Sequence, residues 1–292
     1  MILVTGATGT VGREVVRSFP AGAPLRLMTR NPAQVTGVRP GAEVVAGDYA
    51  DPGSLARVLR GVRGAFLVTN RVGGDDDAVF LRAARTAGVR HVVKLSAAAV
   101  ADERADDLIT RWQRTNEDLL RGSGMDWTLL RPRSFMSNCL SWAGSIRSEG
   151  VVRALYGTSV NACVDPRDIA EVAVRALTDK GHCGAVHTLT GPEAISAVEQ
   201  TDRLARALGV PLRFEELEPE QARAALLRRY PEELADALLG SARRQRDGAK
   251  AAVGGGVAEV TGRPARSFDE WAGDHVTAFA PRDVLMRAMA VT

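Results

Sequence analysis

The chain has 292 residues, of which 45% are hydrophobic and 25% charged, so it is long enough to bury a large core and is expected to be soluble and globular. Basic residues outnumber acidic ones by only three and the two are interspersed, which argues against nucleic acid or an anionic membrane as a partner. A strand candidate begins at Ile2 and no run of about eighteen apolar residues follows, so we expect a cytoplasmic protein without a signal peptide or membrane span.

In chain order, short apolar runs with strand character alternate with helical patterns as far as Leu130. The strand candidates read MILV, LRLMT, AEVVAG, GAFLVT, HVVKLS and DWTLLRP. The helical patterns between them read VGREVVRSF, SLARVLRG, AVFLRAARTAG and RWQRTNEDLLRGSG. This alternation is typical of right-handed βαβ units, so the predicted fold is α/β, a Rossmann-type doubly wound parallel sheet of six strands.

After Pro132 the pattern becomes less regular. Two short strand candidates, VNACV at 160–164 and VHTLTG at 186–191, flank a helical pattern at 165–179. Beyond Ser196 the sequence is mostly helical. These features predict a second, smaller and mainly helical lobe.

We therefore place a first domain at residues 1–152, with residues 166–182 returning to it, and a C-terminal lobe mainly at 153–292. The Gly- and Arg-rich stretch at 241–257 is expected to be a solvated, mobile connection, because such segments rarely order themselves. We find no internal repeat.

The three cysteines, Cys139, Cys163 and Cys183, are odd in number and lack C-x-x-C or metal-ligand spacing. We expect small buried or half-buried thiols in a reducing compartment, and no metal site.

The motif TGATGTVG, from Thr5 to Gly12, follows the first predicted strand and opens the first predicted helix. In this setting Gly6 permits a tight turn, Gly9 lets the backbone approach a pyrophosphate, and Gly12 allows close packing of the helix. The backbone N–H groups of residues 8–11 would then face phosphates at a helix N-terminus. The motif predicts a dinucleotide site.

Two later positions bear on which dinucleotide binds. Arg30 and Asn31 follow the second strand, where an acidic residue would hold a ribose 2′-OH, so a 2′-phosphate and hence NADP(H) is preferred over NAD(H). The alternative for Arg30 is an ordinary solvated arginine. Asp48, after the third strand, either accepts from the adenine amino group or caps the next helix or a turn.

Six segments together resemble the NmrA-like family of atypical short-chain dehydrogenases/reductases, in particular its bacterial NAD(P)-binding reductases. They read TGATGTVG, TRNP, GDYADPGSL, SGMDWTLLRPRSFMSN, VDPRDIAEVAVRAL and VTGRPARSFDEWAGDHVTAF. The resemblance implies a Rossmann domain with a C-terminal substrate lobe, NADP(H) in the cleft, and either reductase activity or cofactor sensing without chemistry. A homo-oligomer is possible.

By the same resemblance, a set of residues lines the cofactor: Thr8, Gly9, Thr10, Val11, Arg30, Asp48, Thr69, Asn70 and Arg131. We add their neighbours in the same segments: Gly6, Gly12, Asn31, Tyr49, Arg71 and Pro132. The candidate substrate residues come from the lobe side of the chain: Arg133, Phe135, Met136, Trp142 and Tyr156. For the last four, a place in the lobe's own core is an equal alternative.

The chain lacks the usual chemistry of short-chain reductases, in which a Lys lowers the pKa of a Tyr four residues before it. The residues four before its three lysines are Arg90, Ala176 and Arg246. On the helix that would carry the pair stands Gln113, where relatives often have His, and an amide cannot exchange a proton. The four histidines are scattered, and no H-E-x-x-H or G-x-S-x-G motif occurs.

Two hypotheses follow. In the first, the protein is an NADPH-dependent reductase of a small electrophile that needs little acid help, such as a quinone, an enone or an aromatic polyketide. Gln113 then orients the substrate, and water or Ser96 completes the proton path. In the second, it is a non-catalytic NADP(H)-binding redox sensor with a partner.

Overall fold

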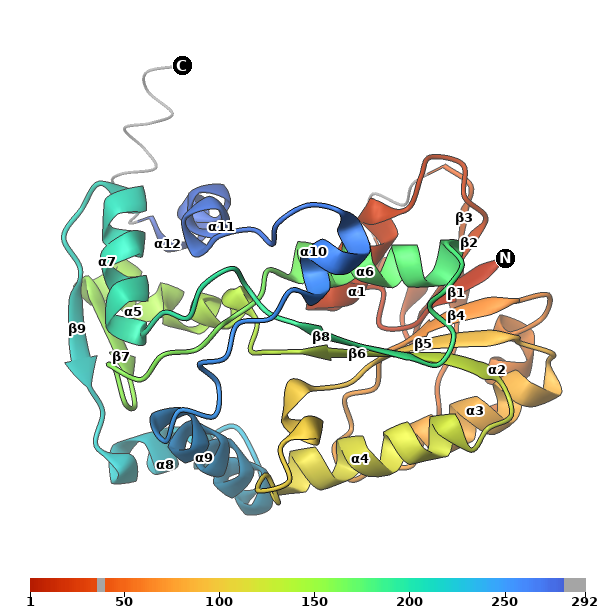
Figure 1. Cartoon of the computed structure of the whole chain (residues 1–292), viewed down its shortest axis with the longest axis horizontal. Helices are drawn as coiled ribbons and strands as arrows, with labels where there is room; N and C mark the ends of the chain where they lie inside the picture. The colour runs from red at the N-terminus through yellow and green to blue at the C-terminus, as the bar shows by residue number, and fades with distance from the viewer. Residues whose placement is uncertain (36–39, 281–292) are drawn as a thin grey trace. The chain divides into compact units, whose positions relative to one another are not determined.

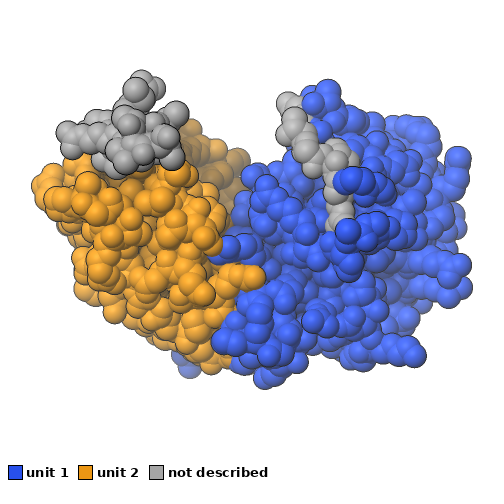
Figure 2. All heavy atoms as spheres, turned by 90° about the horizontal axis from the view of Figure 1, so that it is seen from above, with its two compact units in different colours: residues 1–132, 166–189, 255–264 blue, residues 133–165, 190–254, 265–292 orange. Residues whose placement is uncertain are grey.

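The computed structural model describes residues 1–35 and 40–280 (Figure 1). Contacts divide the chain into two compact units, coloured separately in Figure 2. Unit 1 comprises 1–132, 166–189 and 255–264, and unit 2 comprises 133–165, 190–254 and 265–292. Residues 281–292, the end of the predicted lobe, lie outside the described part.

Unit 1 contains a parallel sheet with helices on both faces. Its strands are β1 (Ile2–Val4), β2 (Leu25–Thr29), β3 (Ala42–Ala46), β4 (Gly64–Leu67), β5 (His91–Leu95), β6 (Asp126–Pro132) and β8 (Ala185–Leu189). Its helices are α1 (Thr10–Ser18), η1 (Pro32–Gln34), α2 (Pro52–Val58), α3 (Asp76–Thr86), η2 (Ala98–Ala101), α4 (Leu108–Arg121), α6 (Pro166–Thr178) and α10 (Gly256–Thr261).

Among the described residues the sheet has seven strands in the order β3-β2-β1-β4-β5-β6-β8, all parallel. The predicted α/β class and its Rossmann-type parallel sheet are confirmed, but the sheet has seven strands where six were predicted, because β8 joins it beside β6. The order reverses between β1 and β4, where Val4 pairs in register with Phe66. In such sheets ligands bind outside the carboxyl ends of the strands at this switch point.

The two faces of the sheet are covered by different helices: α1, α6 and α10 on one side and α2, α3 and α4 on the other (Figure 1). Strand β4 is buried throughout, as expected for a central strand covered on both faces. The core under α2–α4 includes Leu55, Phe80 and Leu120 from the helices and Leu67 and Leu129 from the strands. Side chains at alternate positions of these strands therefore point toward α2–α4.

Unit 2 is mainly helical. Its elements are η3 (Met136–Trp142), α5 (Ala143–Glu149), β7 (Val151–Ala154), α7 (Ala197–Leu208), β9 (Arg213–Glu216), α8 (Pro219–Leu227), α9 (Glu232–Arg246), α11 (Phe268–Asp274) and α12 (Val276–Phe279). Strands β7 and β9 pair in parallel. The core of the unit gathers around Trp271, whose ring stacks on His275 with centroids 4.4 Å apart.

Residues 133–152, placed with the first domain from the sequence, pack in unit 2. They form η3 and α5, and Met136 and Ile146 from these helices are buried in the same core as Trp271. The chain therefore changes unit directly after β6 ends at Pro132.

Of the two short strand candidates after Pro132, one is wrong. The segment 160–164 is not a strand, because it makes only isolated bridges, Asn161 with Ile195 and Val164 with Phe135. Its apolar character reflects burial: residues 161–165 are all buried. The other strand candidate, at 186–191, is confirmed in the main by β8, which ends at Leu189.

The stretch 241–257, expected to be a solvated, mobile connection, is helical at both ends and exposed at 252–255. It begins inside α9 and ends inside α10, where Val257 is 1% exposed. The extended part between these helices is fixed by the bond from the amide of Gly254 to Thr190 Oγ1 (3.0 Å). Gly256 serves close packing, since a Cβ there would lie 2.2 Å from the carbonyl oxygen of Thr188.

Candidate functional site

The glycine motif forms a tight turn between β1 and α1. Gly6 has φ +60°, a left-handed conformation that favours glycine, and its carbonyl accepts from the amide of Gly9 (2.8 Å). Gly9 is the N-cap of α1, is exposed and presents no side chain, and the first turn of α1 has no acidic residue. A Cβ on Gly12 would lie 2.0 Å from the carbonyl oxygen of Gly6. An uncovered helix N-terminus of this kind fits the pyrophosphate of a dinucleotide.

Two arginines belong to this end of the sheet. Arg13 donates from Nε to the carbonyl of Gly9 (3.2 Å) and from its Nη2 to that of Thr8 (3.1 Å), so its guanidinium lies against the turn. Arg30 directly follows β2, whose carboxyl end neighbours that of β1, and is exposed without an ion-pair partner among the described residues. Asn31 caps η1, accepting from the amide of Ala33 (3.2 Å).

The segment after β3 is fixed by its own side chains. Asp48 Oδ1 accepts from the amide of Ala50 (2.9 Å), which makes a local turn, while Asp51 and not Asp48 is the N-cap of α2. The phenol of Tyr49 donates to the carbonyl of Val68 (3.0 Å), and burial raises its pKa well above the ordinary value. Of the local roles expected for Asp48, the structure shows the turn and not the helix cap, and its contact with the adenine amino group stays a prediction.

The loop from β4 to α3 holds three predicted cofactor residues. Thr69 is buried and donates to Asp77 Oδ2 (2.5 Å), whereas Asn70 is exposed. Arg71 pairs with Asp75 (2.8 Å) and with Asp76, and these contacts raise its pKa.

A second network connects β5, α4 and β6. Ser96 donates to Glu117 Oε1 (2.6 Å), and Arg131 donates to the same oxygen from Nε (2.9 Å) and to Oε2 from its Nη2. Burial would raise the pKa of Glu117, but hydrogen bonds from Arg131 and Ser96 hold it below the ordinary value. Because Ser96 gives its proton to a carboxylate, its oxygen offers only lone pairs to another group.

Gln113 lies on α4, one helical turn before Glu117, and is 8% exposed. Its Oε1 is buried and has no hydrogen-bond partner among the described residues. A buried amide oxygen without a partner is costly, so this atom is suited to accept from a ligand that enters the site.

The predicted substrate residues follow Pro132, the last residue of β6, and all belong to unit 2. Met136 is 2% exposed and Trp142 packs against the same core, as the core alternative expects. Arg133 and Phe135 are half-buried.

Tyr156 is also half-buried and differs from those four in its backbone. It is the only non-glycine among residues 1–35 and 40–280 with a left-handed φ, at +53°. Glu216 holds this conformation by accepting from the amides of Tyr156 and Gly157, and the guanidinium of Arg246 lies 5.2 Å from the ring centroid. Backbone strain of this kind often marks a binding surface.

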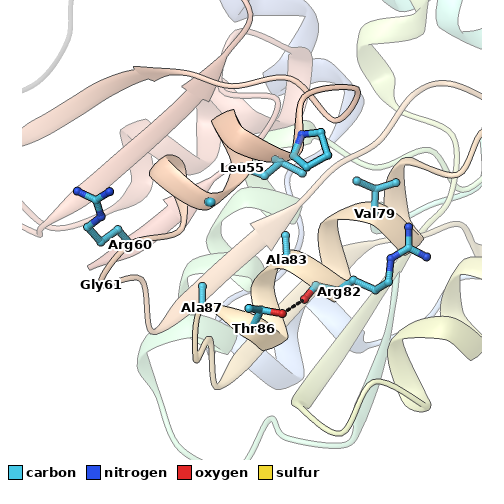
Figure 3. Close-up of a pocket in the computed structure, with 10 residues that line it drawn as sticks. Leu55, Arg60, Gly61, Val79, Arg82, Ala83, Thr86 and Ala87 are labelled. Atoms are coloured by element: carbon cyan, nitrogen blue, oxygen red, sulfur yellow. Dashed lines mark hydrogen bonds between the residues drawn. The ribbon is translucent and has the colours of Figure 1, made fainter.

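A cavity of about 510 Å³ lies elsewhere in unit 1, between α2 and α3 (Figure 3). Leu55, Val79 and Ala83 form its apolar lining, and Arg60 and Arg82 lie toward its two ends. None of the predicted site residues lines it, and its hydroxyl, that of Thr86, donates to the carbonyl of Arg82 (3.0 Å). The cavity therefore offers no group for the predicted chemistry.

The sequence prediction missed four charged residues: Arg13, Asp77, Lys94 and Glu117. Glu117 stands four residues after Gln113, at the spacing where the missing Lys was sought, so a search for any charged residue there would have found it. Arg13 directly follows the last glycine of the motif. Lys94 and Asp77 carry no motif, and only the structure brings them together.

Comparison with known proteins extends this description. A family model described as NAD(P)H-binding matches residues 6–180, more than half of the chain. The (4-alkanoyl-5-oxo-2,5-dihydrofuran-3-yl)methyl phosphate reductase of Streptomyces griseus is 57% identical over 281 residues, covering 96% of this chain and 100% of its own. The NAD(P)H azoreductase of Xenophilus azovorans is 38% identical, covering 96% and 99%.

A solved structure is also similar over nearly the whole chain. The NADPH-dependent quinone oxidoreductase of Escherichia coli, complexed with NADPH, has a TM-score of 0.81 and 26% identity, covering 94% of this chain and 99% of that one. Within the described residues, no helix has the length and apolar character to cross a membrane.

Proposed function

The chain belongs to the NAD(P)H-binding family, with relatives in the NmrA-like group of atypical short-chain reductases, and from this premise we propose its substrate class and cofactor preference. It is an NAD(P)H-dependent reductase that transfers hydride to a small electrophile. The reductase hypothesis is thus confirmed over that of a non-catalytic sensor.

The proposed substrate is an unsaturated lactone with a phosphate ester on a methylene group attached to the ring. Its ring C=C bond is conjugated with both the lactone carbonyl and an acyl carbonyl. The relative at 57% identity is named for such a furanone. Hydride addition to the β-carbon leaves negative charge spread over two carbonyl groups, which is a stabilised enolate. Such an anion needs no strong acid beside it, and water can protonate it afterwards.

The observation that carries this proposal is the protonation chemistry of the site. Gln113 cannot act as an acid near neutral pH, and the hydroxyl of Ser96 donates its proton to Glu117. When bound, NAD(P)H supplies the hydride. The chain's own contribution is to orient the substrate by Gln113, whose side-chain NH₂ can donate to a carbonyl, while the Glu117–Arg131 pair fixes Ser96.

The test follows NADPH oxidation with an acyl lactone phosphate, its dephosphorylated form, a quinone, an azo dye and a simple ketone. We expect the fastest turnover with the acyl lactone phosphate, two hydrogens added across the ring C=C bond, and none with the ketone. Turnover of the ketone, or of the quinone alone, would rule out the proposed class.

For the cofactor we propose a preference for NADPH, supported by Arg30, the exposed cation directly after β2. A charge-assisted hydrogen bond to the 2′-phosphate contributes about 1.5 to 3 kcal/mol, roughly ten- to a hundredfold in affinity. Arg30→Ala should therefore lower the affinity for NADPH and leave the affinity for NADH unchanged. Arg13→Ala should lower the affinity for both cofactors, because Arg13 donates hydrogen bonds to two carbonyls of the turn.

Titration of both cofactors into these variants measures the preference. Arg17→Ala is the matched control, since Arg17 lies on the same helix but is paired with Glu14 (2.8 Å). Equal affinity of the wild type for NADPH and NADH would exclude the preference.

A further inference from the structure

Lys94 is the most unusual buried group of unit 1. Its side chain is completely buried on β5, and its ammonium forms an ion pair with Asp77, whose side chain is also completely buried. Among the described residues no other group accepts a hydrogen bond from Nζ, and the ring of Trp112 lies 6.0 Å away. Replacing such a pair with apolar residues is often neutral for stability, so stability alone does not account for it.

The pair does make a directed contact with the candidate cofactor site. Asp77 stands in the first turn of α3, where the helix dipole favours a carboxylate, and its Oδ2 accepts from the hydroxyl of Thr69 (2.5 Å). One Asp77 oxygen thus contacts Lys94 and the other Thr69. The contacts run from β5 through α3 to the loop that follows β4.

The consequence is a fixed hydrogen-bonding direction at Thr69. A hydroxyl has one proton, and an ionised carboxylate can only accept it. Thr69 Oγ1 therefore presents lone pairs to its remaining side.

The rest of the loop is also held in place. Trp112 Nε1 donates to the carbonyl of Gly74 (3.2 Å), and Arg71 pairs with Asp75 and Asp76. The loop is thus ordered before any ligand arrives, which lowers the entropy cost of binding.

We propose that Lys94 and Asp77 are positioning residues for the cofactor, which orient the Thr69 hydroxyl so that it accepts a hydrogen bond from a donor group of NAD(P)H, such as a ribose hydroxyl or the carboxamide. This inference rests on the proposed placement of the cofactor beside Thr69. Lys94 acts on the ligand only through Asp77 and Thr69.

The experiment measures the Kd for NADPH and the KM and kcat of turnover. Thr69→Val should raise the Kd and KM about tenfold with a smaller change in kcat, as expected for one lost hydrogen bond, and Thr69→Ser should restore both. Asp77→Asn should have a similar effect, because an amide can donate to the hydroxyl and reverse its direction. The Thr69→Val/Asp77→Asn double variant should bind NADPH no more weakly than either single variant.

Asp77→Asn leaves the charge of Lys94 buried and unpaired, which can prevent folding. The double variant Lys94→Met/Asp77→Leu removes both charges. We expect it to fold and to bind NADPH as weakly as Thr69→Val. Thr128→Val is the matched control, because its hydroxyl is equally buried and donates to the carbonyl of His182 (2.7 Å), and its Kd should be unchanged.

Wild-type affinity in Thr69→Val, or in folded Lys94→Met/Asp77→Leu, would overturn the inference, as would effects that add in the double variant. Gly9→Val distinguishes a failure of this inference from a failure of the proposed function. If Gly9→Val does not bind NADPH while the Thr69 variants bind it normally, the cofactor site is supported and the positioning role of Lys94 and Asp77 is wrong.

Discussion

Gly9 and Gly12 stand in one turn, but they are glycine for different reasons. A Cβ on Gly12 would lie 2.0 Å from the backbone oxygen of Gly6, which cannot move without breaking the turn. A Cβ on Gly9 would lie 3.2 Å from the same oxygen, in an exposed position with extended backbone that valine also adopts. The fold therefore requires glycine at position 12 but not at position 9.

Gly9→Val should therefore leave the fold largely intact and abolish NADPH binding, because the side chain fills the space above the helix N-terminus. Gly12→Ala should instead lower the free energy of unfolding, by about 1 to 3 kcal/mol, as overpacking does. Circular dichroism and cofactor titration of both variants distinguish these effects. Normal NADPH binding by Gly9→Val would show that the phosphates lie elsewhere.

At the scale of elements, three histidines lie on or beside neighbouring strands: His91 on β5, His187 on β8 and His182 just before β8, with β6 between β5 and β8. His91 Nε2 bonds Thr128 Oγ1 (2.9 Å), and His182 Nδ1 bonds His187 Nε2 (3.1 Å). Burial, and the neighbouring His182, lower the pKa of His91 and of His187 below the ordinary 6.5.

Below about pH 6.5 the unfolded chain then binds more protons than the folded one, so stability should fall as the pH decreases through this range. The double variant His91→Gln/His187→Gln should lose less stability between pH 7 and 5 than the wild type. Denaturant unfolding at several pH values measures this, and equal losses in both proteins would contradict it.

The elements also show what the sequence could predict. The first six strands of the main sheet are predictable because each is an apolar run between turn residues, and VHTLTG at 186–191 contains most of β8, the seventh. β7 and β9 are not predictable in this way, since both are short and β9 reads RFEE, with three charged residues in four. The loop at 160–164 has the apolar pattern of a strand because most of its residues are buried, although they do not pair in a sheet.

At the scale of the whole molecule, the chemistry depends on groups that do not titrate near neutral pH. The hydrogen bonds of Glu117 keep its pKa below the ordinary value, so it is ionised throughout, and burial keeps Tyr49 neutral. Sequence could predict the missing Tyr-Lys pair, but not that Ser96 would be bound to Glu117, since that contact joins β5 to α4 across 21 residues.

The rate of reduction of an activated lactone should therefore be nearly constant between about pH 6 and 8, where neither Ser nor Gln titrates. Gln113→Ala should lower turnover less than the ~10²- to 10⁴-fold that loss of a general acid costs, because an amide only orients the substrate. Gln113→His is the informative contrast: an imidazole with a pKa of about 6.5 should introduce a pH-dependent limb. Stopped-flow measurement of hydride transfer across this range separates chemistry from product release. A bell-shaped profile in the wild type would mean that another residue supplies the proton, and the enolate would then not explain the missing acid.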